Sequence, residues 1–290
     1  MREILLKAFK TATKPFLGSG IGKYRPIAKL YAAIAGYVIP DNKRIVEVNG
    51  YKLNVHQKND GISMQLLLTG GYEPYETGLF KNVVKEGHCV IDIGANIGYY
   101  TLLAASLVGT SGKVYAFEPH PKNFELLKKN VLENRFENVV VCQNAVTDMN
   151  GEIKLFIGLD HGTHSLDNVR CTTQESIQIQ GCSLDNFFHG DVKPDIIKMD
   201  IQGAETKALR GMSRMLGAAK DVILFTECEP EMLGDLELFW KELENCGFKY
   251  IYLIDDRKKS LIPASLGSVD EHCKKNKYAN LLCAKRQMAV

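Results

Sequence analysis

Polar side chains stand at or near the ends of several apolar runs in this chain. Asp92, Glu118 and Asp200 directly follow such runs, and Asn144 and Glu227 close two others. Short apolar runs of this kind are typical of buried strands in a parallel sheet. Ligands bind at the carboxyl edge of such sheets. Carboxylate and amide groups gathered there can accept hydrogen bonds from the ammonium and hydroxyl groups of a polar ligand.

A glycine-containing turn follows the first of these runs. The segment CVIDIGANIGYYTLLAA, residues 89–105, passes from a strand through Gly94 and Gly98 into a helical pattern. Dinucleotide-binding turns keep a further glycine where this chain has Asn96, because a pyrophosphate needs bare backbone. We therefore expect a cofactor without a pyrophosphate. S-adenosylmethionine fits, because Asp92 can face its ammonium group and the N–H groups of the turn can bind its carboxylate.

Two later strand ends extend this cofactor hypothesis. Glu118 lies 24 residues after Gly94, and a carboxylate there can accept both ribose hydroxyls. Nicotinamide enzymes use an acid in the same way, so Glu118 alone does not choose between cofactors. Asn144 and Ala145 are placed to border an adenine, although an ordinary turn at the end of a strand explains them equally well.

Strands and helices alternate regularly from residue 89 onwards. Strands are predicted at residues 89–93, 113–118, 138–142, 195–199, 221–228, 248–254 and 279–285. Helices are predicted at residues 97–108, 121–134, 203–216 and 231–246. Two extra strands, 151–157 and 176–181, flank a polar loop. This order predicts an α/β fold with a doubly wound, mostly parallel seven-stranded sheet.

The first seventy residues have a different character. Residues 44–55 alternate around Asn-Gly, which predicts a β-hairpin. Pro26 begins a predicted amphipathic helix in a basic segment, residues 1–40, that holds a single acid. Three interpretations stay open: a helical cap packed on the main domain, contact with a membrane surface, and a targeting peptide, which the scarcity of arginine disfavours. We divide the chain into an N-terminal helical extension with its hairpin, residues 1–70, and a main domain, residues 71–290.

Composition narrows the function classes. The net charge of +2 gives no argument for a nucleic-acid partner. The eight cysteines include no C-x-x-C pair and no histidine at metal-ligand spacing, so no metal site is predicted. This cysteine usage fits a reduced, cytoplasmic compartment. No apolar run approaches the roughly 20 residues that a bilayer-spanning helix needs.

Five segments together resemble one known family. They read VIDIGANIGYYTLLAA, VYAFEPHPKNFELLKKNV, NAVTD, IIKMDIQGAE and LFTECEP. This succession is similar to the FkbM-type S-adenosylmethionine-dependent methyltransferases, which have the class I, Rossmann-like methyltransferase fold. The resemblance implies that residues 71–290 form a methyltransferase domain with S-adenosylmethionine as methyl donor. It also implies a hydroxyl acceptor, because the family mostly methylates hydroxyl groups, often on sugars or natural products.

The resemblance also implies a set of site residues. Contacts to the donor are expected from Asp92, Gly94, Asn96, Gly98, Glu118 and Asn144, and we add their neighbours Tyr99, Pro119 and Ala145. The family motif usually reads D-[VI]-E-G-A-E, and Gln202 replaces its first glutamate here. One carboxylate beside Asp200 is thereby absent, which puts any role proposed for it in doubt.

Two residues are candidates for catalysis. Asp200 can act as the base for a hydroxyl acceptor, although capping the helix that follows explains it equally well. His164, near His161 in a polar loop, can also accept a proton near neutral pH, whereas a surface-loop histidine is the commoner explanation. Glu205 is expected to support the turn after Asp200 through its N–H groups.

We therefore predict O-methylation of a hydroxyl on a sugar, glycan, lipid or natural product. The segment after Asp200 lacks the proline and aromatic residues that grip a planar nitrogen, which argues against nucleobase targets. Two alternatives remain: a nicotinamide-dependent oxidoreductase, which Asn96 disfavours, and a non-catalytic cofactor-binding module. Residues 255–280 are expected to leave the sheet as a loop that overhangs the site.

Overall fold

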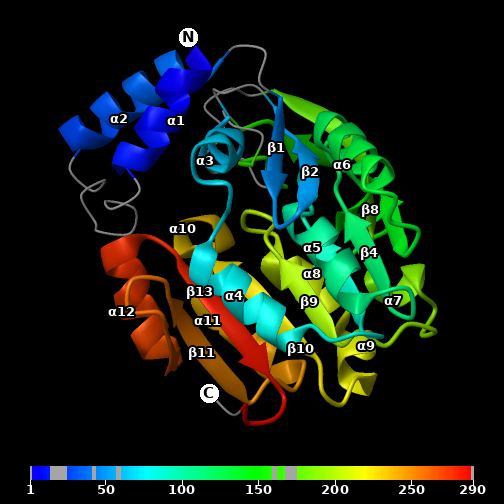
Figure 1. Ribbon diagram of the computed structural model, residues 1–290. Helices are drawn as coiled ribbons and strands as arrows, with labels where there is room; N and C mark the ends of the chain where they lie inside the picture. Colours follow the sequence, from blue (N-terminus) through cyan, green and yellow to red (C-terminus); the bar gives the residue numbers. More distant parts are fainter. Residues whose placement is uncertain are drawn as a thin grey trace.

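The computed structural model describes residues 2–13, 25–40, 44–56, 60–158, 162–166 and 175–288 (Figure 1). Within these residues, eight strands form the main sheet. In spatial order they are β12 (Ser260–Pro263), β11 (Tyr250–Asp255), β13 (Ala279–Ala284), β10 (Ile223–Cys228), β9 (Ile196–Met199), β3 (Cys89–Ile93), β4 (Lys113–Phe117) and β5 (Val139–Cys142). All seven predicted strands are present. The short edge strand β12 corrects the predicted number from seven to eight.

The mostly parallel arrangement is confirmed. Strands β5, β4, β3, β9 and β10 are parallel to one another, whereas β13 runs antiparallel to both β10 and β11. The chain builds the sheet outward from β3 to β5 and then returns to β9 on the other side of β3. The carboxyl ends of β3 and β9 therefore lie side by side where the strand order reverses, which is where such sheets bind ligands.

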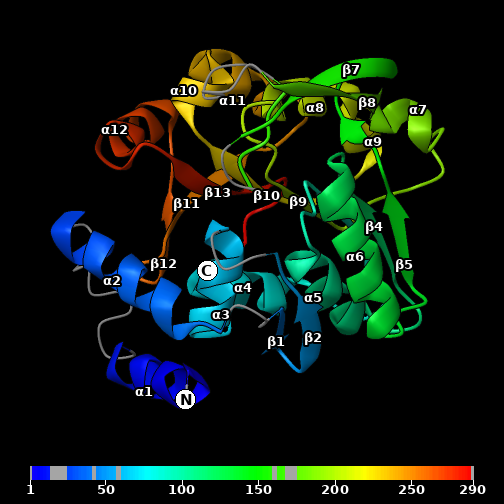
Figure 2. The ribbon, with the colours of Figure 1, turned by 90° about the horizontal axis from the view of Figure 1, so that it is seen from above.

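Helices cover both faces of the sheet (Figure 2). One face carries α4 (Pro74–Val83), α5 (Tyr99–Val108) and α6 (Pro121–Glu133); the other carries α8 (Glu205–Gly211), α9 (Ser213–Ala218), α11 (Leu236–Asn245) and α12 (Leu266–Asn276). Side chains alternate along each strand between two apolar cores. Val90 and Ile196 are buried in the first core, and Ile91 and Ile197 in the second. Burial on both faces explains why these strands are apolar runs without alternation.

Two predicted helices are each broken into two. The predicted helix 203–216 becomes α8 and α9, because the carboxylate of Asp185 accepts hydrogen bonds from Arg214 N and Met215 N and thus caps a new helix start. The predicted helix 231–246 becomes α10 (Pro230–Leu233) and α11, because Gly234 ends the first and Asp235 caps the second. The first break leaves no local sequence signal, because its cap, Asp185, comes from a distant segment of the chain.

Smaller elements complete the carboxyl side of the sheet. Strands β6 (Ala145–Val146), β8 (Ser176–Cys182) and β7 (Gly151–Phe156) form a separate three-stranded sheet, and α7 (Leu184–Phe187) follows it. The expected overhanging loop at residues 255–280 is wrong as a description of structure. The segment contains β12 and α12, whose first turn is closed by a reciprocal capping box between Ser265 and Ser268.

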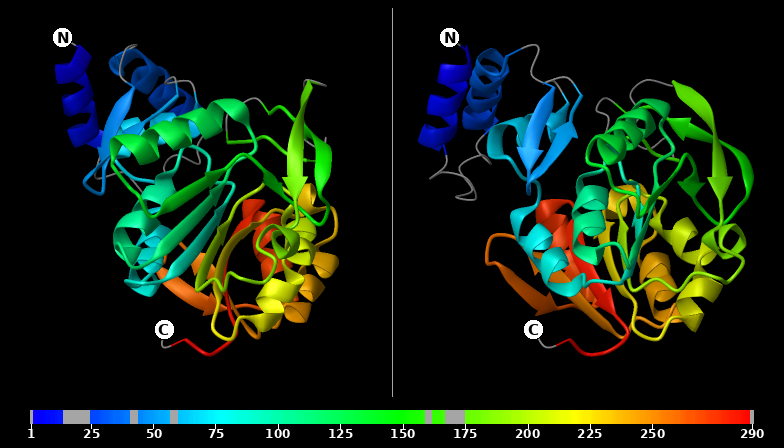
Figure 3. Two further views of the ribbon diagram at one scale, coloured as in Figure 1. Left: turned by 90° about the vertical axis from the view of Figure 1, so that its right-hand side faces the viewer. Right: turned by 45° about the vertical axis from the view of Figure 1, so that its right-hand side comes forward.

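The N-terminal extension contains more structure than a cap. Helices α1 (Arg2–Thr13) and α2 (Arg25–Val38) lie side by side at one corner of the molecule (Figure 3). The predicted hairpin is confirmed as β1 (Ile45–Val48) and β2 (Tyr51–Asn54), with Asn49 and Gly50 at positive φ. Helix α3 (Gly61–Thr69), which was not predicted, connects the hairpin to α4. The predicted boundary at residue 70 stays a prediction.

The hairpin is anchored on the main domain by buried amides. Asn130 of α6 accepts hydrogen bonds from both the backbone N–H and the side-chain amide of Asn54, at 2.7 and 2.9 Å. The Asn130 amide in turn donates to the carbonyl oxygens of Asn54 and Ile97, at 3.0 and 2.7 Å. One fully buried side chain thus joins the hairpin to the glycine turn after β3.

Helices long and apolar enough to cross a membrane are not found among the described residues. Every described cysteine is free, and no cluster of metal-ligating side chains occurs in the described ranges. Cys171 and His161 lie outside those ranges. The cytoplasmic location inferred from the cysteine pattern stays a prediction.

Candidate functional site

The glycine turn closes tightly around the end of β3. Gly94 N and Ala95 N both donate to the carbonyl of Phe117 on β4, at 2.9 and 3.0 Å. Gly94 has φ +82°, and a Cβ added there would lie 2.0 Å from the carbonyl oxygen of Asp200. Asn96 also has positive φ, at 50°. The turn therefore requires glycine at position 94 for two reasons, backbone conformation and close packing against the end of β9.

Two adjoining cavities open at this turn. The first is lined by Gly94, Asn96, Phe117, Glu118, Pro119, Asn123, Asn144, Ala145, Val146, Leu155, Gly162, His164, Leu166, Asp200, Ile201, Gln202 and Ala204. The second is lined by Asp60, Gly61, Ile62, Gln65, Tyr72, Asp92, Gly94, Ala95, Asn96, Ile97, Tyr99, Tyr100, Gly162, Thr163, Lys198, Asp200, Gln202 and Glu227. We call them the β4-side cavity and the β9-side cavity. They share Gly94, Asn96, Gly162, Asp200 and Gln202, so one elongated molecule can lie across both.

Asp92 is a buried carboxylate at the end of β3. Its Oδ2 accepts a hydrogen bond from the hydroxyl of Thr101, at 2.5 Å, and it pairs across the sheet with Lys198 of β9. Burial raises the pKa of Asp92 to about 6, with the Thr101 bond and the Lys198 charge opposing the shift. The carboxyl group lines the β9-side cavity, where it can pair with a cation.

Glu118 lies at the equivalent end of β4. Its Oε2 accepts a hydrogen bond from Asn96 N at 2.8 Å, and its Oε1 accepts from His120 N at 2.9 Å. Oε1 accepts a second, longer hydrogen bond from the Asn123 side-chain amide at 3.4 Å, whereas Oε2 keeps a second lone pair. Burial raises the pKa of Glu118 to about 7, and the two backbone bonds oppose that shift. The carboxylate is therefore held rigidly in the β4-side cavity, where a pair of hydroxyls can bind.

The remaining predicted donor contacts divide between the cavities. Pro119, Asn144 and Ala145 line the β4-side cavity together with Glu118. Tyr99 lines the β9-side cavity, where its hydroxyl bonds to the backbone of Tyr72 and to Thr77. Gly98 lines neither: it is buried at the start of α5 with φ +96°, and a Cβ there would lie 2.8 Å from Leu127.

Asp200 stands where the two cavities meet. The side-chain amide of Gln202 donates to Asp200 Oδ1 at 2.9 Å and to Glu227 Oε2 at 3.0 Å. Gln202 adopts positive φ, 53°, which turns its side chain back over the strand end. Burial, followed by the nearby charge of Asp200, holds the pKa of Glu227 well above its usual range. The amide that departs from the family motif therefore joins two carboxyl groups that would otherwise repel each other.

Glu205 supports the turn after β9, as its position in the sequence suggested. Its two carboxylate oxygens accept hydrogen bonds from Ile201 N and Gly203 N, at 3.1 and 2.9 Å. Burial raises its pKa to about 7. Because Glu205 rather than Asp200 accepts these turn N–H bonds, the Asp200 carboxylate remains directed at the cavities.

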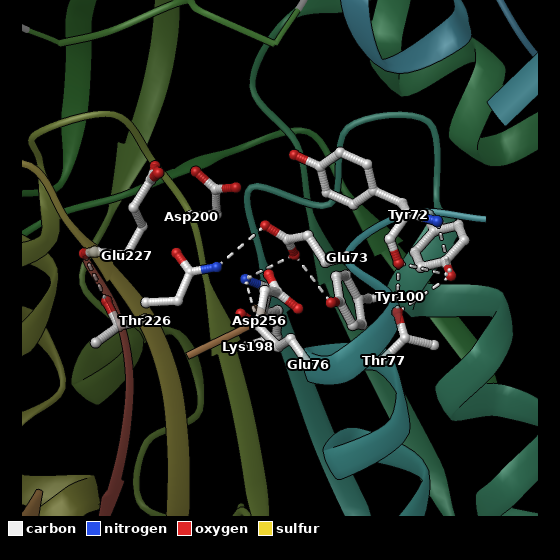
Figure 4. Close-up of polar contacts among 12 residues, drawn as sticks. Tyr72, Glu73, Glu76, Thr77, Tyr100, Lys198, Asp200, Thr226, Glu227 and Asp256 are labelled. Carbon is white, nitrogen blue, oxygen red and sulfur yellow. Dashed lines mark hydrogen bonds and ion pairs between the residues drawn. The ribbon is translucent and has the colours of Figure 1, made fainter. Parts of the chain in front are cut away.

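A buried ionic cluster, which the sequence argument missed, lies beside the β9-side cavity and contributes Lys198 and Tyr100 to its lining (Figure 4). Lys198 Nζ lies 2.8 Å from Glu76 Oε1 and 3.9 Å from Glu73 Oε2. The Tyr100 hydroxyl donates to Glu73 at 3.0 Å, and Asn280 donates to its other oxygen at 3.3 Å. The available signal was a single lysine inside the apolar strand IIKM, because a lysine buried in a parallel sheet must be paired.

The charges in this cluster depend on one another. Burial and the neighbouring Glu76 raise the pKa of Glu73 to about 8, with Lys198 opposing. Burial lowers the pKa of Lys198, but the carboxyl groups of Glu76 and Glu73 outweigh this effect and keep it above its usual value. Lys198 is therefore a permanent cation among four acids (Glu73, Glu76, Asp200 and Glu227).

His164 lies on the β4 side of the junction. Its Nδ1 accepts a hydrogen bond from Gly158 N at 3.1 Å, and its ring lies 4.1 Å from that of His120, centroid to centroid. It lines the β4-side cavity with Glu118 and Asn144 and is absent from the residues that line the other cavity. The structure thus brings His164 to the site but beside the predicted nucleoside contacts.

Residues 92–250 match the family model described as "Methyltransferase FkbM domain". This segment covers more than half of the chain and contains most of the site. The chain belongs to the FkbM methyltransferase family. The predicted family is confirmed, and with it the prediction of an S-adenosylmethionine-dependent methyltransferase domain.

Named relatives are similar over part of their length. The chain is 29% identical to the hexuronic acid methyltransferase AglP of Haloferax volcanii over 150 residues, which are 50% of this chain and 59% of that protein. It is 33% identical to a probable cobalt-precorrin-6B C(15)-methyltransferase of Sulfurisphaera tokodaii over 108 residues, 36% of this chain and 55% of that protein. A solved S-adenosylmethionine-dependent O-methyltransferase from Thermotoga maritima superimposes with a TM-score of 0.43 and 17% identity, covering 85% of this chain and 79% of that one.

Proposed function

We propose that this chain transfers a methyl group from S-adenosylmethionine to a hydroxyl group of a sugar-containing acceptor. The observation that carries the proposal is the junction of the two cavities at Asp200. The β4-side cavity offers nucleoside contacts, whereas the β9-side cavity offers carboxylates, tyrosines and a cation. A donor that spans the junction would present its methyl group beside Asp200.

The residues present fit this donor. Glu118 offers a rigidly held carboxylate to a ribose diol, with Oε2 accepting only one hydrogen bond from the protein, and Asn144 and Ala145 border the space beyond it. Asp92 offers a buried carboxylate to an ammonium group. When bound, S-adenosylmethionine supplies an electrophilic methyl group on a sulfonium centre. Gly94 permits the close approach of the turn, and the residues around the junction hold the reacting atoms in line.

Asp200 is the proposed base. In the reaction the acceptor oxygen forms a bond to the methyl carbon, the carbon–sulfur bond breaks, and the hydroxyl proton passes to the Asp200 carboxylate. The Gln202 amide holds one oxygen of Asp200, which leaves the other for the acceptor. Because His164 lies beside the predicted nucleoside contacts, we assign it to donor binding in preference to proton transfer.

The proposed acceptor class rests on the polar groups that line the β9-side cavity and on one named relative. Carboxylates and tyrosine hydroxyls around the β9-side cavity are suited to bind the hydroxyl groups of a polyol. A relative named as a hexuronic acid methyltransferase supports a sugar acceptor. A nicotinamide-dependent oxidoreductase is disfavoured by the family match and by Asn96.

The test separates donor binding from chemistry. Calorimetry should detect S-adenosylmethionine binding by the unaltered chain and marked weakening in Glu118→Ala. Asp200→Asn should abolish transfer of labelled methyl groups to a pool of cellular glycans while leaving donor affinity nearly unchanged. Asp221→Asn is the matched control, because Asp221 is exposed and precedes the amino end of β10, whereas the candidate site lies at the carboxyl ends of the strands. If Asp200→Asn loses donor binding and transfer equally, Asp200 is a structural residue and the proposed base is wrong.

A further inference from the structure

Helices α1 and α2 form an antiparallel pair with an apolar outer side. The ring of Phe9 lies 5.1 Å from that of Tyr31, and the Arg2 guanidinium lies 5.5 Å over the ring of Tyr37. The start of α1 is therefore next to the end of α2. Helical periodicity places residues 30, 34 and 37 on one stripe of α2.

Burial separates the two sides of this pair. Leu6, Ala35 and Val38 are buried against the rest of the protein. Large apolar side chains remain exposed on the other side, by 40% at Leu5, 62% at Leu30, 39% at Ile34 and 65% at Tyr37. We call these four residues the outer apolar patch. Monomeric proteins rarely expose large apolar residues in such a group without an interaction partner.

The same segment carries an excess of positive charge. Residues 1–40 contain seven lysine and arginine residues and one acid, Glu3, whereas the whole chain has a net charge of only +2. The rest of the protein is therefore acidic. Arg2 and Lys7 on α1 are exposed. An apolar patch with exposed basic residues on the same helical pair matches an anionic lipid surface, in which acyl chains lie beneath negatively charged headgroups.

We propose that the outer apolar patch binds the surface of an anionic phospholipid bilayer, with α1 and α2 lying in its plane. Association with a second copy of this chain is disfavoured, because it would bring two strongly basic segments together. The proposal is independent of the methyl-transfer reaction.

Its consequence for the site comes through α3. Helix α1 contacts α3, and Ile62 and Gln65 of α3 line the β9-side cavity. Figure 1 shows α3 between the helical pair and the sheet. The helical pair that carries the outer apolar patch is therefore connected through α3 to the cavity proposed for the acceptor.

Sedimentation with lipid vesicles tests the proposal on the full chain. Vesicles of phosphatidylcholine and phosphatidylglycerol in equal parts are compared with phosphatidylcholine alone. The unaltered chain should sediment with the mixed vesicles, and much less with the neutral ones or at high salt. Leu30→Glu/Ile34→Glu should weaken binding by at least about tenfold, since two apolar contacts are replaced by charges that the lipid repels.

Matched controls keep the test decisive. Leu132→Glu alters an equally exposed leucine, 66% exposed on α6 and distant in sequence from the patch, and should bind as the unaltered chain does. Lys7→Glu should reduce binding to the mixed vesicles only. Thermal melting and S-adenosylmethionine affinity confirm that each variant is folded. The proposal is overturned if the unaltered chain does not sediment with anionic vesicles, if the double variant binds them equally well, or if light scattering shows a dimer that the double variant dissociates.

Discussion

Removing the positive charge of Lys198 should destabilise the fold more than most single substitutions. Its Nζ lies 2.8 Å from Glu76 and 3.9 Å from Glu73, and the Lys198 side chain is 5% exposed. Two charges about 4 Å apart interact by about 4 kcal/mol at the effective dielectric constant of a protein. Removing one member of a buried pair typically costs about 3–5 kcal/mol, because its partner keeps an uncompensated charge. We expect Lys198→Met to lower the free energy of unfolding by that amount.

The loss should depend on pH with a defined sign. Glu73 has a folded-state pKa of about 8, above the 4.5 of an ordinary glutamate. The folded state therefore holds a proton that the unfolded state has released, so stability falls as pH rises between these two values. Without Lys198, the pKa of Glu73 rises further and the fall in stability continues to higher pH. Lys198→Met should thus be more destabilising at about pH 9 than at about pH 6.

Urea unfolding at both pH values measures this effect. Lys241→Met is the control, because Lys241 is exposed on α11, and it should change stability by less than about 0.5 kcal/mol. Lys198→Met/Glu76→Gln should recover at least half of the loss, since the buried carboxylate is removed with its partner. A loss below about 1 kcal/mol at the higher pH, or no recovery in the double variant, would refute the assigned charges.

Two further predictions concern the donor site. Affinity for S-adenosylmethionine should rise as pH increases through about 6, because Asp92 then ionises and can pair with an ammonium group; calorimetry across this range should show the rise, and Asp92→Asn should flatten it. Gly94→Ala should abolish donor binding, because its Cβ would lie 2.0 Å from the Asp200 carbonyl. Gly217→Ala, where nothing lies within 4 Å, should bind the donor normally in the same assay.

The sequence predicted the elements whose signals are local. The apolar run ending at Asp92, the glycine turn and the Asn-Gly hairpin each depend on a few adjacent residues, and each is present. That Glu118 and Asp200 lie close together could be predicted, because parallel strands place their carboxyl ends at one edge of the sheet. The position of the candidate site therefore followed from the predicted strand order and from no single motif.

Features that depend on distant contacts could not be predicted. The break at Met212 arises because Asp185, far away in the chain, caps a new helix. Glu73 and Lys198 are far apart in the sequence and come into contact only in the folded protein, so no local sequence pattern predicts their ion pair. His164 illustrates the converse: its residue type suggested proton transfer, and the structure places it in the β4-side cavity but not in the β9-side cavity, so its role stays a prediction.

The buried side chain of Asn130 determines where this protein can be shortened. It bonds the hairpin through Asn54 and the cofactor turn through Ile97. If the chain began after the hairpin, the Asn130 side-chain amide would lose its Asn54 partners, and both this amide and the Ile97 carbonyl would contact water. The proposed donor turn would lose part of its support even though no proposed donor contact was removed. A shortened chain that keeps this turn intact should therefore retain the hairpin, β1 and β2.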